Sequence, residues 1–167
     1  VSNHAEYLEM LTKIHALGNV SVSFDVGWDT TGVWNEGIFE LLPMIDVLFM
    51  NETECLHYTR SDDVEAGARR LAEKAGMAVI KLGRKGSLAI QNGERYFVPA
   101  YSVQAVDTTG AGDSFNAGFV YGYLQGLPME ECLRCGNGCG ALSVTKLGGN
   151  TGFPFRPELE KWIRDHE

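Results

Sequence analysis

The chain has 167 residues, of which 44% are hydrophobic and 22% charged, a composition typical of a folded globular domain with a substantial core. Its formal net charge of −8 argues against a nucleic-acid partner, because phosphate backbones are bound by basic surfaces. No apolar run approaches the roughly 20 residues of a membrane span, and no signal-peptide pattern opens the chain, so no membrane partner is expected.

The first part of the chain predicts a helix followed by a strand. Apolar residues recur at helical spacing from about Asn3 to Leu17, and Gly18 ends this pattern. The β-branched run 20–24 predicts a strand, which ends in the polar, turn-rich segment 25–29. A helix and a strand that opens into a loop form the repeat unit of a parallel sheet, and ligands bind at such loops.

The middle of the chain continues this alternation and then predicts a hairpin. Pro43 interrupts the first of these helices, and Asn92-Gly93 is a strong signal for a hairpin turn. The predicted elements are a helix over 33–42, a strand over 46–50, a helix over 61–75, a strand over 78–82, and strands over 87–91 and 95–98.

The last third predicts helices. A helix follows Asp113 and ends at Gly126-Leu127-Pro128, a second spans 130–147, and a third carries Leu159, Trp162 and Ile163. The second contains several glycines, and each glycine inside a helix costs about 1 kcal/mol relative to alanine. Tight contact with a neighbour or a ligand is therefore expected there.

Three of the four cysteines form a C-x-x-C-x-x-x-C pattern, which suggests either a metal or redox site or one buried helix face. We interpret them as core, because apolar residues flank them and a free cysteine packs as a small hydrophobe. The four histidines lack ligand spacing. This cysteine usage fits a reducing cytoplasm. The cysteines are Cys55, Cys132, Cys135 and Cys139.

The most informative stretch runs from Val106 to Phe119. Its loop contains Gly110, Ala111 and Gly112, whose small side chains leave backbone N–H groups open, and the helix that follows adds its positive end. Asp113 lies at the start of that helix, and a carboxylate beside an anion site fits a general base. The alternative is that Asp113 merely caps the helix.

This stretch resembles the second signature of the ribokinase-like carbohydrate kinases, the PfkB family, D-T-x-G-A-G-D. The resemblance implies that Asp113 is the catalytic base and that Gly110, Ala111 and Gly112 form the anion hole. It also implies an α/β layered sandwich with a mainly parallel sheet flanked by helices. Because members of the family are longer, residues 1–167 look like a single domain, the ATP-binding C-terminal half, with the N-terminal part of the fold absent.

Two further motifs match the family in order. Asn51 and Glu54, three residues apart at a helix start, can hold a water-bound Mg²⁺ beside nucleotide phosphates, or form a capping box. Lys81-x-Gly83-x-x-Gly86 matches the family's nucleotide loop, although a Gly-rich connection between strands is also common. The resemblance makes Asn51, Glu54, Lys81, Gly83, Gly86 and Gly112 ATP-binding residues, with Glu54 serving Mg²⁺ through water.

The resemblance adds two weaker assignments and one departure. Asn137 matches a position beside the adenine, or is an ordinary hydrogen-bonded helical Asn. The loop 148–152, with Asp107 and the Thr109 carbonyl, matches a site for a monovalent cation such as K⁺. The family's D-x-N-x-R pattern after the first strand is not kept, because Gly27 and Asp29 replace Asn and Arg.

The resemblance therefore implies ATP-dependent phosphorylation of a sugar hydroxyl. We expect this reaction to be slow or absent in the chain alone, because the family's sugar contacts lie mostly in the half that precedes Val1. One alternative is a non-catalytic module that binds nucleotide or a partner chain, as a homo-oligomer or with the missing N-terminal half. The other is a nucleoside or hydroxymethylpyrimidine kinase of the same fold.

Overall fold

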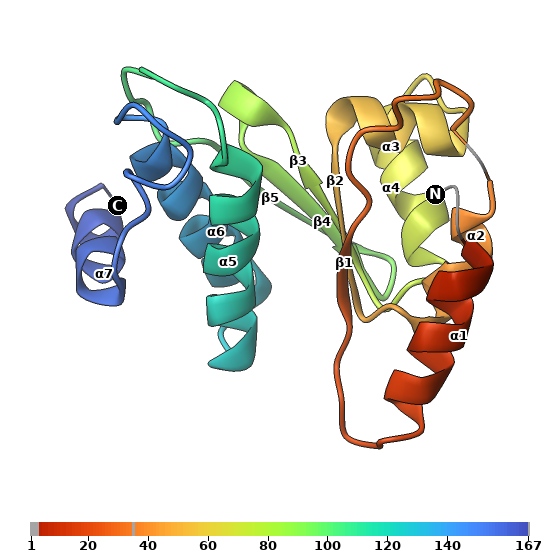
Figure 1. Ribbon diagram of the computed structural model, residues 1–167. Helices are drawn as coiled ribbons and strands as arrows, with labels where there is room; N and C mark the ends of the chain where they lie inside the picture. Colours follow the sequence, from red (N-terminus) through yellow and green to blue (C-terminus); the bar gives the residue numbers. More distant parts are fainter. Residues whose placement is uncertain (1–3, 35, 167) are drawn as a thin grey trace. The chain divides into compact units, whose positions relative to one another are not determined.

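Strands and helices alternate along the computed structural model, which describes residues 4–34 and 36–166 (Figure 1). Strand β1 (Ser23–Asp25) pairs in parallel with β2 (Val47–Asn51), which pairs in parallel with β3 (Ala78–Lys81). Strands β4 (Ser87–Gln91) and β5 (Glu94–Val98) complete a mixed sheet of order β1-β2-β3-β4-β5 in the described chain. The expected mainly parallel α/β sheet is confirmed.

Helices precede β1, connect β1 to β2 and β2 to β3, and follow β5. None of the helices in the described ranges is long and apolar enough to cross a membrane. They are α1 (His4–His15), α2 (Ile38–Leu41), α3 (Glu52–Thr59), α4 (Val64–Ala72), α5 (Ala111–Leu124), α6 (Met129–Ser143) and α7 (Arg156–Asp165), with 3₁₀ turns η1 (Leu42–Met44) and η2 (Gly83–Lys85).

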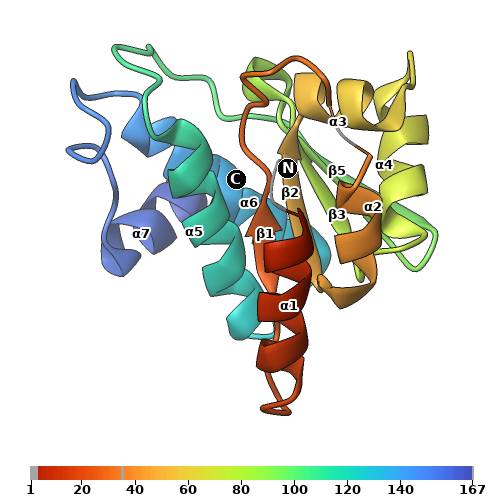
Figure 2. The same ribbon diagram turned by 45° about the vertical axis from the view of Figure 1, so that its right-hand side comes forward.

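The chain divides into two compact units, which are described separately. The first comprises Val1–Lys81 and Ala89–Arg95. Within it, α3 contacts β2 and β3, α4 contacts β3, and α1 contacts α2 (Figure 2). Strand β2, which lies between β1 and β3, is a continuous apolar run, and the burial of its consecutive residues Leu48, Phe49 and Met50 shows that both of its faces are covered.

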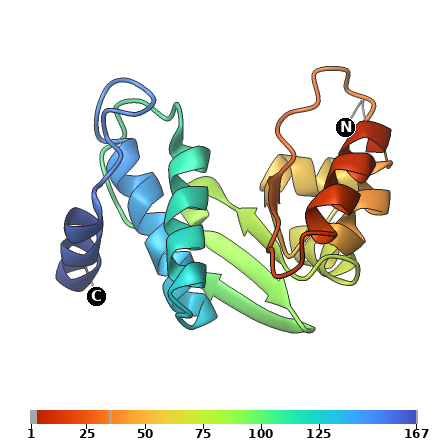
Figure 3. The ribbon, with the colours of Figure 1, turned by 60° about the horizontal axis from the view of Figure 1, so that its bottom comes forward.

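The second unit comprises Leu82–Leu88 and Tyr96–Glu167. Helices α5 and α6 lie side by side in it (Figure 3), and α7 packs against α6 through a core that includes Cys139 and Leu159. A Cβ on Gly118 would overlap the Cys135 carbonyl, and one on Gly136 would lie 2.7 Å from the Phe115 ring. The glycines of this helix pair therefore allow close contact between neighbouring helices.

Several predicted boundaries are wrong for reasons of tertiary contact. The helix expected over 33–42 begins only at Ile38, because Trp34 adopts a positive φ of 51° and its N–H donates to Asp29. The strand expected over 20–24 begins only at Ser23. The helix expected over 130–147 ends at Ser143, and the next carbonyl, that of Val144, accepts from two N–H groups of the 106–107 segment. The expected helix start at Asn3 lies outside the described residues.

The hairpin prediction is confirmed. Asn92 and Gly93 both have positive φ, 53° and 81°, and they join β4 to its neighbour β5. Two consecutive left-handed residues are what a two-residue turn requires if it is to match the twist of the strands that it connects.

Candidate active site

The start of α5 is the feature on which the functional reading depends. Its N-cap is Gly110, which has the left-handed φ of 75° and provides no side-chain cap. A Cβ at this position would overlap the carbonyl oxygen of Gly149, so glycine is required by both the backbone angle and the neighbouring loop. Asp113 is the third residue of the helix, and its side chain is exposed. The alternative that Asp113 caps the helix is therefore wrong.

The backbone of this turn leaves donors open. The Ala111 N–H donates to the Thr108 carbonyl at 3.2 Å, and the Ser114 N–H donates to the Gly110 carbonyl at 2.9 Å. Between them, the N–H groups of Gly112 and Asp113 have no backbone acceptor within the described ranges. Open N–H groups at the positive end of a 14-residue helix are the kind of arrangement that binds anions, and here a carboxylate lies beside them; the anion-hole and base roles expected for this turn stay predictions.

Asp107 connects the loop before α5 to the loop after α6. Its two carboxylate oxygens accept from the N–H groups of Thr109 and Gly148, each at 2.9 Å. These backbone hydrogen bonds hold the pKa of the Asp107 carboxyl below its ordinary value. The loop at Gly148 and the turn that leads into α5 are thus joined through one side chain. The cation-binding role expected for Asp107 and the Thr109 carbonyl stays a prediction.

Asn51 and Glu54 form a reciprocal capping box at the start of α3. The Glu54 N–H donates to Asn51 Oδ1, and the Asn51 N–H donates to Glu54 Oε2, both at 2.8 Å. The capping box, which was the alternative to a magnesium-binding role for these two residues, is therefore present. Glu54 is only 4% exposed, and burial, with a smaller contribution from the charge of Asp25, raises the pKa of its carboxyl. A buried carboxylate of this kind gains from a nearby cation, and the magnesium role stays a prediction.

Lys81, at the end of β3, forms an ion pair that the sequence analysis did not find. Its Nζ lies 2.6 Å from Asp25 Oδ2 at the end of β1. Asp25 also accepts a long hydrogen bond, 3.4 Å from the Gly27 N–H. The signal for the pair was available, because parallel strand ends meet at one sheet edge and these two carry opposite charges.

The two glycines of the Lys81–Gly86 motif serve a tight turn. Gly83 has φ 58° with open space around it, and the Leu82 N–H donates to the Gly86 carbonyl at 2.9 Å. Gly86 has φ 118°, and a Cβ there would overlap the Val98 carbonyl. Backbone packing thus accounts for Gly86, and the nucleotide role of the motif stays a prediction.

Asn137 is a buried, hydrogen-bonded residue of α6. Its Nδ2 donates to the carbonyl oxygens of Val98 and Pro99, each at 3.1 Å, and so attaches the helix to the end of β5. Asn137 therefore has the role of an ordinary hydrogen-bonded helical Asn, and its contact with an adenine ring stays a prediction.

The cysteine prediction is confirmed. All four side chains are buried free thiols, as expected for residues of the core. Burial raises the pKa of the Cys55 and Cys139 thiols to about 12, and that of Cys132 and Cys135 to about 11.

Residues 2–156 match the model of the pfkB family carbohydrate kinases. The chain belongs to this family. Ribokinase of Haemophilus influenzae is 38% identical over 133 residues, which are 74% of this chain and 42% of that protein. Cytidine kinase of Thermococcus kodakarensis is 34% identical over 135 residues, 78% of this chain and 48% of that protein.

A solved structure, described as a putative Ribokinase II from E. coli in complex with ATP and Mg²⁺, superposes with a TM-score of 0.86 at 26% identity. The superposition covers 96% of this chain and 53% of that one. The chain thus spans about half the length of these relatives.

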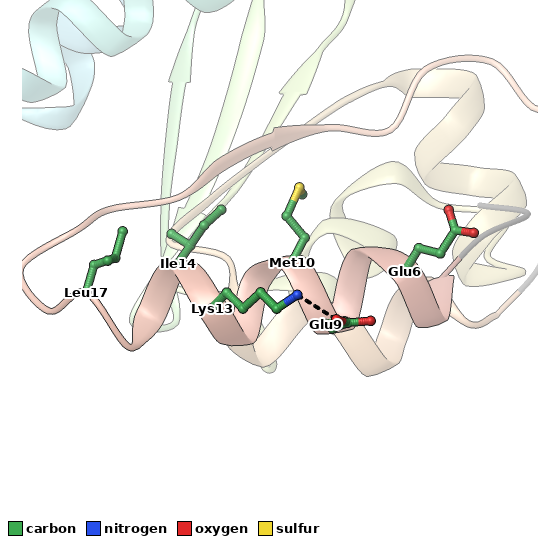
Figure 4. A pocket seen from close by; sticks show the side chains of 6 residues that line it. All are labelled: Glu6, Glu9, Met10, Lys13, Ile14 and Leu17. Carbon is green, nitrogen blue, oxygen red and sulfur yellow. Dashed lines mark hydrogen bonds and ion pairs between the residues drawn. The ribbon is translucent and has the colours of Figure 1, made fainter.

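A hollow along α1 is lined by none of the residues assigned to the family's motifs (Figure 4). It has a volume of about 480 Å³. Alkyl chains and one exposed ion pair line it, the pair joining Lys13 Nζ and Glu9 Oε1 at 2.6 Å. Its lining residues are Glu6, Glu9, Met10, Lys13, Ile14 and Leu17.

Proposed function

We propose that this pfkB family chain carries the nucleotide-binding part of an ATP-dependent phosphotransferase that acts on a sugar hydroxyl. The observation that carries the proposal is the start of α5. Gly110 turns the backbone so that the N–H groups of Gly112 and Asp113 stay open, and the Asp113 carboxylate is exposed beside them.

In this proposal Asp113 accepts the proton of the attacking hydroxyl, which makes the oxygen a better nucleophile towards phosphorus. The Gly110–Gly112 turn and the helix dipole stabilise the negative charge on the phosphoryl group during transfer. The Gly149 carbonyl beside Gly110 restricts the turn to one shape, so the donors are preorganised before the ligand arrives.

The buried carboxylate of Glu54 fits Mg²⁺, because hard oxygen donors suit this ion and a carboxylate whose pKa is raised by burial gains from a nearby cation. Bound there through water, Mg²⁺ would offset phosphate charge. Asn51 holds Glu54 in one rotamer through the capping box. The E. coli relative, solved in complex with ATP and Mg²⁺, supports this pairing of ligands.

The remaining nucleotide contacts are assigned by resemblance to Lys81, Gly83, Gly86 and Asn137. Lys81 already neutralises Asp25, so it would have to share its charge with a phosphate. The loop at 148–152, with Asp107 and the Thr109 carbonyl, remains our candidate for a monovalent cation such as K⁺.

Calorimetric titration with Mg²⁺ and a non-hydrolysable ATP analogue tests the nucleotide site. We expect saturable binding that is weakened by Glu54→Gln and little changed by Asp113→Asn. A well-folded chain that shows no binding, or equal binding by the wild type and Glu54→Gln, contradicts the proposal.

Turnover tests the base. With ATP and a panel of sugars we expect slow transfer by the chain alone, and none above background for Asp113→Asn. Equal rates for the two proteins would show that Asp113 is not the base. Family-like rates would contradict the expectation that the acceptor contacts lie outside these residues.

A second candidate is a nucleoside kinase, favoured by the 34% identity to the cytidine kinase. The same base and anion site would serve it, because the reaction again attacks phosphorus with an alcohol oxygen. Adding cytidine and other nucleosides to the acceptor panel separates the two. A non-catalytic, partner-binding role predicts instead that gel filtration finds an associated species and that no acceptor is phosphorylated.

A further inference from the structure

A second cavity, of about 540 Å³, lies in the first unit, and none of the residues given a kinase role lines it. Its volume falls within the roughly 300–1,000 Å³ of small-molecule sites. Four aromatic rings from separate elements line it: Tyr7 from α1, Phe24 from β1, Trp28 from the following loop and Tyr58 from α3. Because the faces of aromatic rings attract cations, this lining has the composition of a site for a cationic group.

The loop that forms one side of this cavity is held in a single shape. The Asp29 carboxylate accepts from the Thr31 N–H at 2.8 Å, the Thr31 hydroxyl at 2.6 Å and the Trp34 N–H at 2.6 Å. Arg60 donates to the Trp34 carbonyl at 3.2 Å. Trp34 is buried at a φ of 51° and stacks on His57, with ring centroids 4.6 Å apart. These contacts fix the loop before a ligand arrives, which lowers the entropy cost of binding.

This rigid loop presents an exposed indole at the cavity. Trp28 is 61% exposed, and its ring meets Trp34 edge-on, with centroids 5.0 Å apart. The buried Trp34 thus supports one side of Trp28 while much of the ring stays open. Among the aromatic side chains, tryptophan attracts a cation most strongly, so Trp28 is the best-placed partner for a positive group.

The charges at the cavity are negative. Two carboxylates, Asp25 and Asp29, belong to the lining, and the described residues that line the cavity include no Lys, Arg or His. Asp25 is paired with Lys81, whereas the donors that the described chain offers Asp29 are uncharged N–H and O–H groups, which leave its charge in place. Burial raises the pKa of the Tyr58 hydroxyl, and the charges of Asp29 and Glu54 raise it further. A cation is therefore attracted here and an anion repelled.

The same carboxylates have little capacity left to accept hydrogen bonds. A carboxylate offers about four lone-pair sites, and Asp29 already accepts two hydrogen bonds on Oδ1 and one on Oδ2. Asp25 Oδ2 lies 2.6 Å from Lys81 Nζ. A primary ammonium or a guanidinium group would find few carboxylate partners for its N–H donors, and unpaired donors are costly. A quaternary ammonium group has no N–H donor, so the charge and the rings suffice to hold it.

We propose that this cavity binds a small organic cation that carries a quaternary ammonium group, with this group against the Trp28 indole and beside the Asp29 carboxylate. The Thr30 hydroxyl, which also lines the cavity, suits a polar group on the rest of the ligand. This ligand is not the phosphoryl acceptor, whose contacts are expected outside these residues. The inference is therefore independent of the proposed function.

The test is calorimetry without nucleotide, with choline as the probe. Its uncharged analogue, in which carbon replaces the nitrogen, has the same shape and isolates the effect of the charge. We expect saturable binding of choline and binding of the neutral analogue that is at least about tenfold weaker. Protonated ethanolamine, which brings N–H donors in place of methyl groups, should also bind more weakly than choline.

Three variants test the assigned residue. Trp28→Ala should weaken choline binding about tenfold, and Trp28→Phe should give an intermediate affinity because a smaller aromatic face remains. Phe155→Ala, at an exposed aromatic residue outside the cavity, is the matched control and should change nothing. Circular dichroism establishes that each variant is folded.

Equal binding of choline and its neutral analogue, equal affinity of Trp28→Ala and wild type, or no choline binding by a folded wild-type protein overturns the inference. Because nucleotide and acceptor are absent from this titration, each of these outcomes leaves the Mg²⁺–nucleotide titration and the Asp113→Asn comparison untouched.

Discussion

Replacement of Gly110 by alanine tests the geometry of the anion site most directly. A left-handed backbone angle costs an L-residue about 1–2 kcal/mol, and Gly110 has φ 75°. The added Cβ would also overlap the Gly149 carbonyl, a backbone atom that cannot rotate away. Overpacking of this kind costs about 1–3 kcal/mol more. We therefore expect Gly110→Ala to lower the free energy of unfolding by about 2–5 kcal/mol.

Gly126 provides the matched control at the other end of the same helix. Its φ is 69°, but no atom lies within 4 Å of the point that a Cβ would occupy, so Gly126→Ala should cost only the backbone term of about 1–2 kcal/mol. Urea unfolding followed by circular dichroism measures both variants. Nucleotide titration should show weaker binding for Gly110→Ala alone. Equal losses of stability in the two variants, or full binding by Gly110→Ala, would refute the reasoning.

Three further predictions follow from the titratable groups. Burial raises the pKa of Glu54, so ionisation of this carboxyl destabilises the fold as the pH rises above the ordinary value of 4.5. Glu54→Gln keeps a side-chain oxygen that accepts from the Asn51 N–H, so this variant should have a higher melting temperature than wild type near pH 7 and the same melting temperature near pH 4. Because the pKa of Asp107 is lowered, its ionised carboxylate stabilises the fold above the ordinary value of 3.8, and this stabilisation is lost as the pH falls below that value. Asp107→Asn, whose single oxygen cannot accept from the N–H groups of both Thr109 and Gly148, should melt at a lower temperature than wild type at pH 7, and the difference in melting temperature should close near pH 2. The four buried thiols, with pKa values raised to about 11 or 12, should resist Ellman's reagent at pH 8 until urea is added.

Each of these has a clear contrary outcome. A Glu54→Gln protein that melts below wild type at pH 7 would mean that the carboxylate is already compensated in the fold. A pH-independent gap for Asp107→Asn would assign its effect to packing instead of charge. Rapid labelling of any cysteine in the folded protein would show that the helix that carries it, α3 for Cys55 or α6 for the other three, opens or leaves the thiol accessible.

Short-range patterns in the amino-acid sequence were sufficient to predict the kinds of element and the open turn that leads into α5. Hydrophobic periodicity is a local property, and the small residues before Asp113 leave little choice but an open turn entering a helix. The capping box of Asn51 and Glu54 was equally readable, because both partners lie within one helical turn.

The contacts between distant segments are established only by the assembled fold. The pairing of Lys81 with Asp25, 56 positions apart, depends on the order of the strands in the sheet. The left-handed Trp34, which shortens the predicted helix, is imposed by Asp29, Arg60 and the ring of His57. No local pattern encodes these, because each arises from chain segments that meet only when the sheet and its helices are assembled.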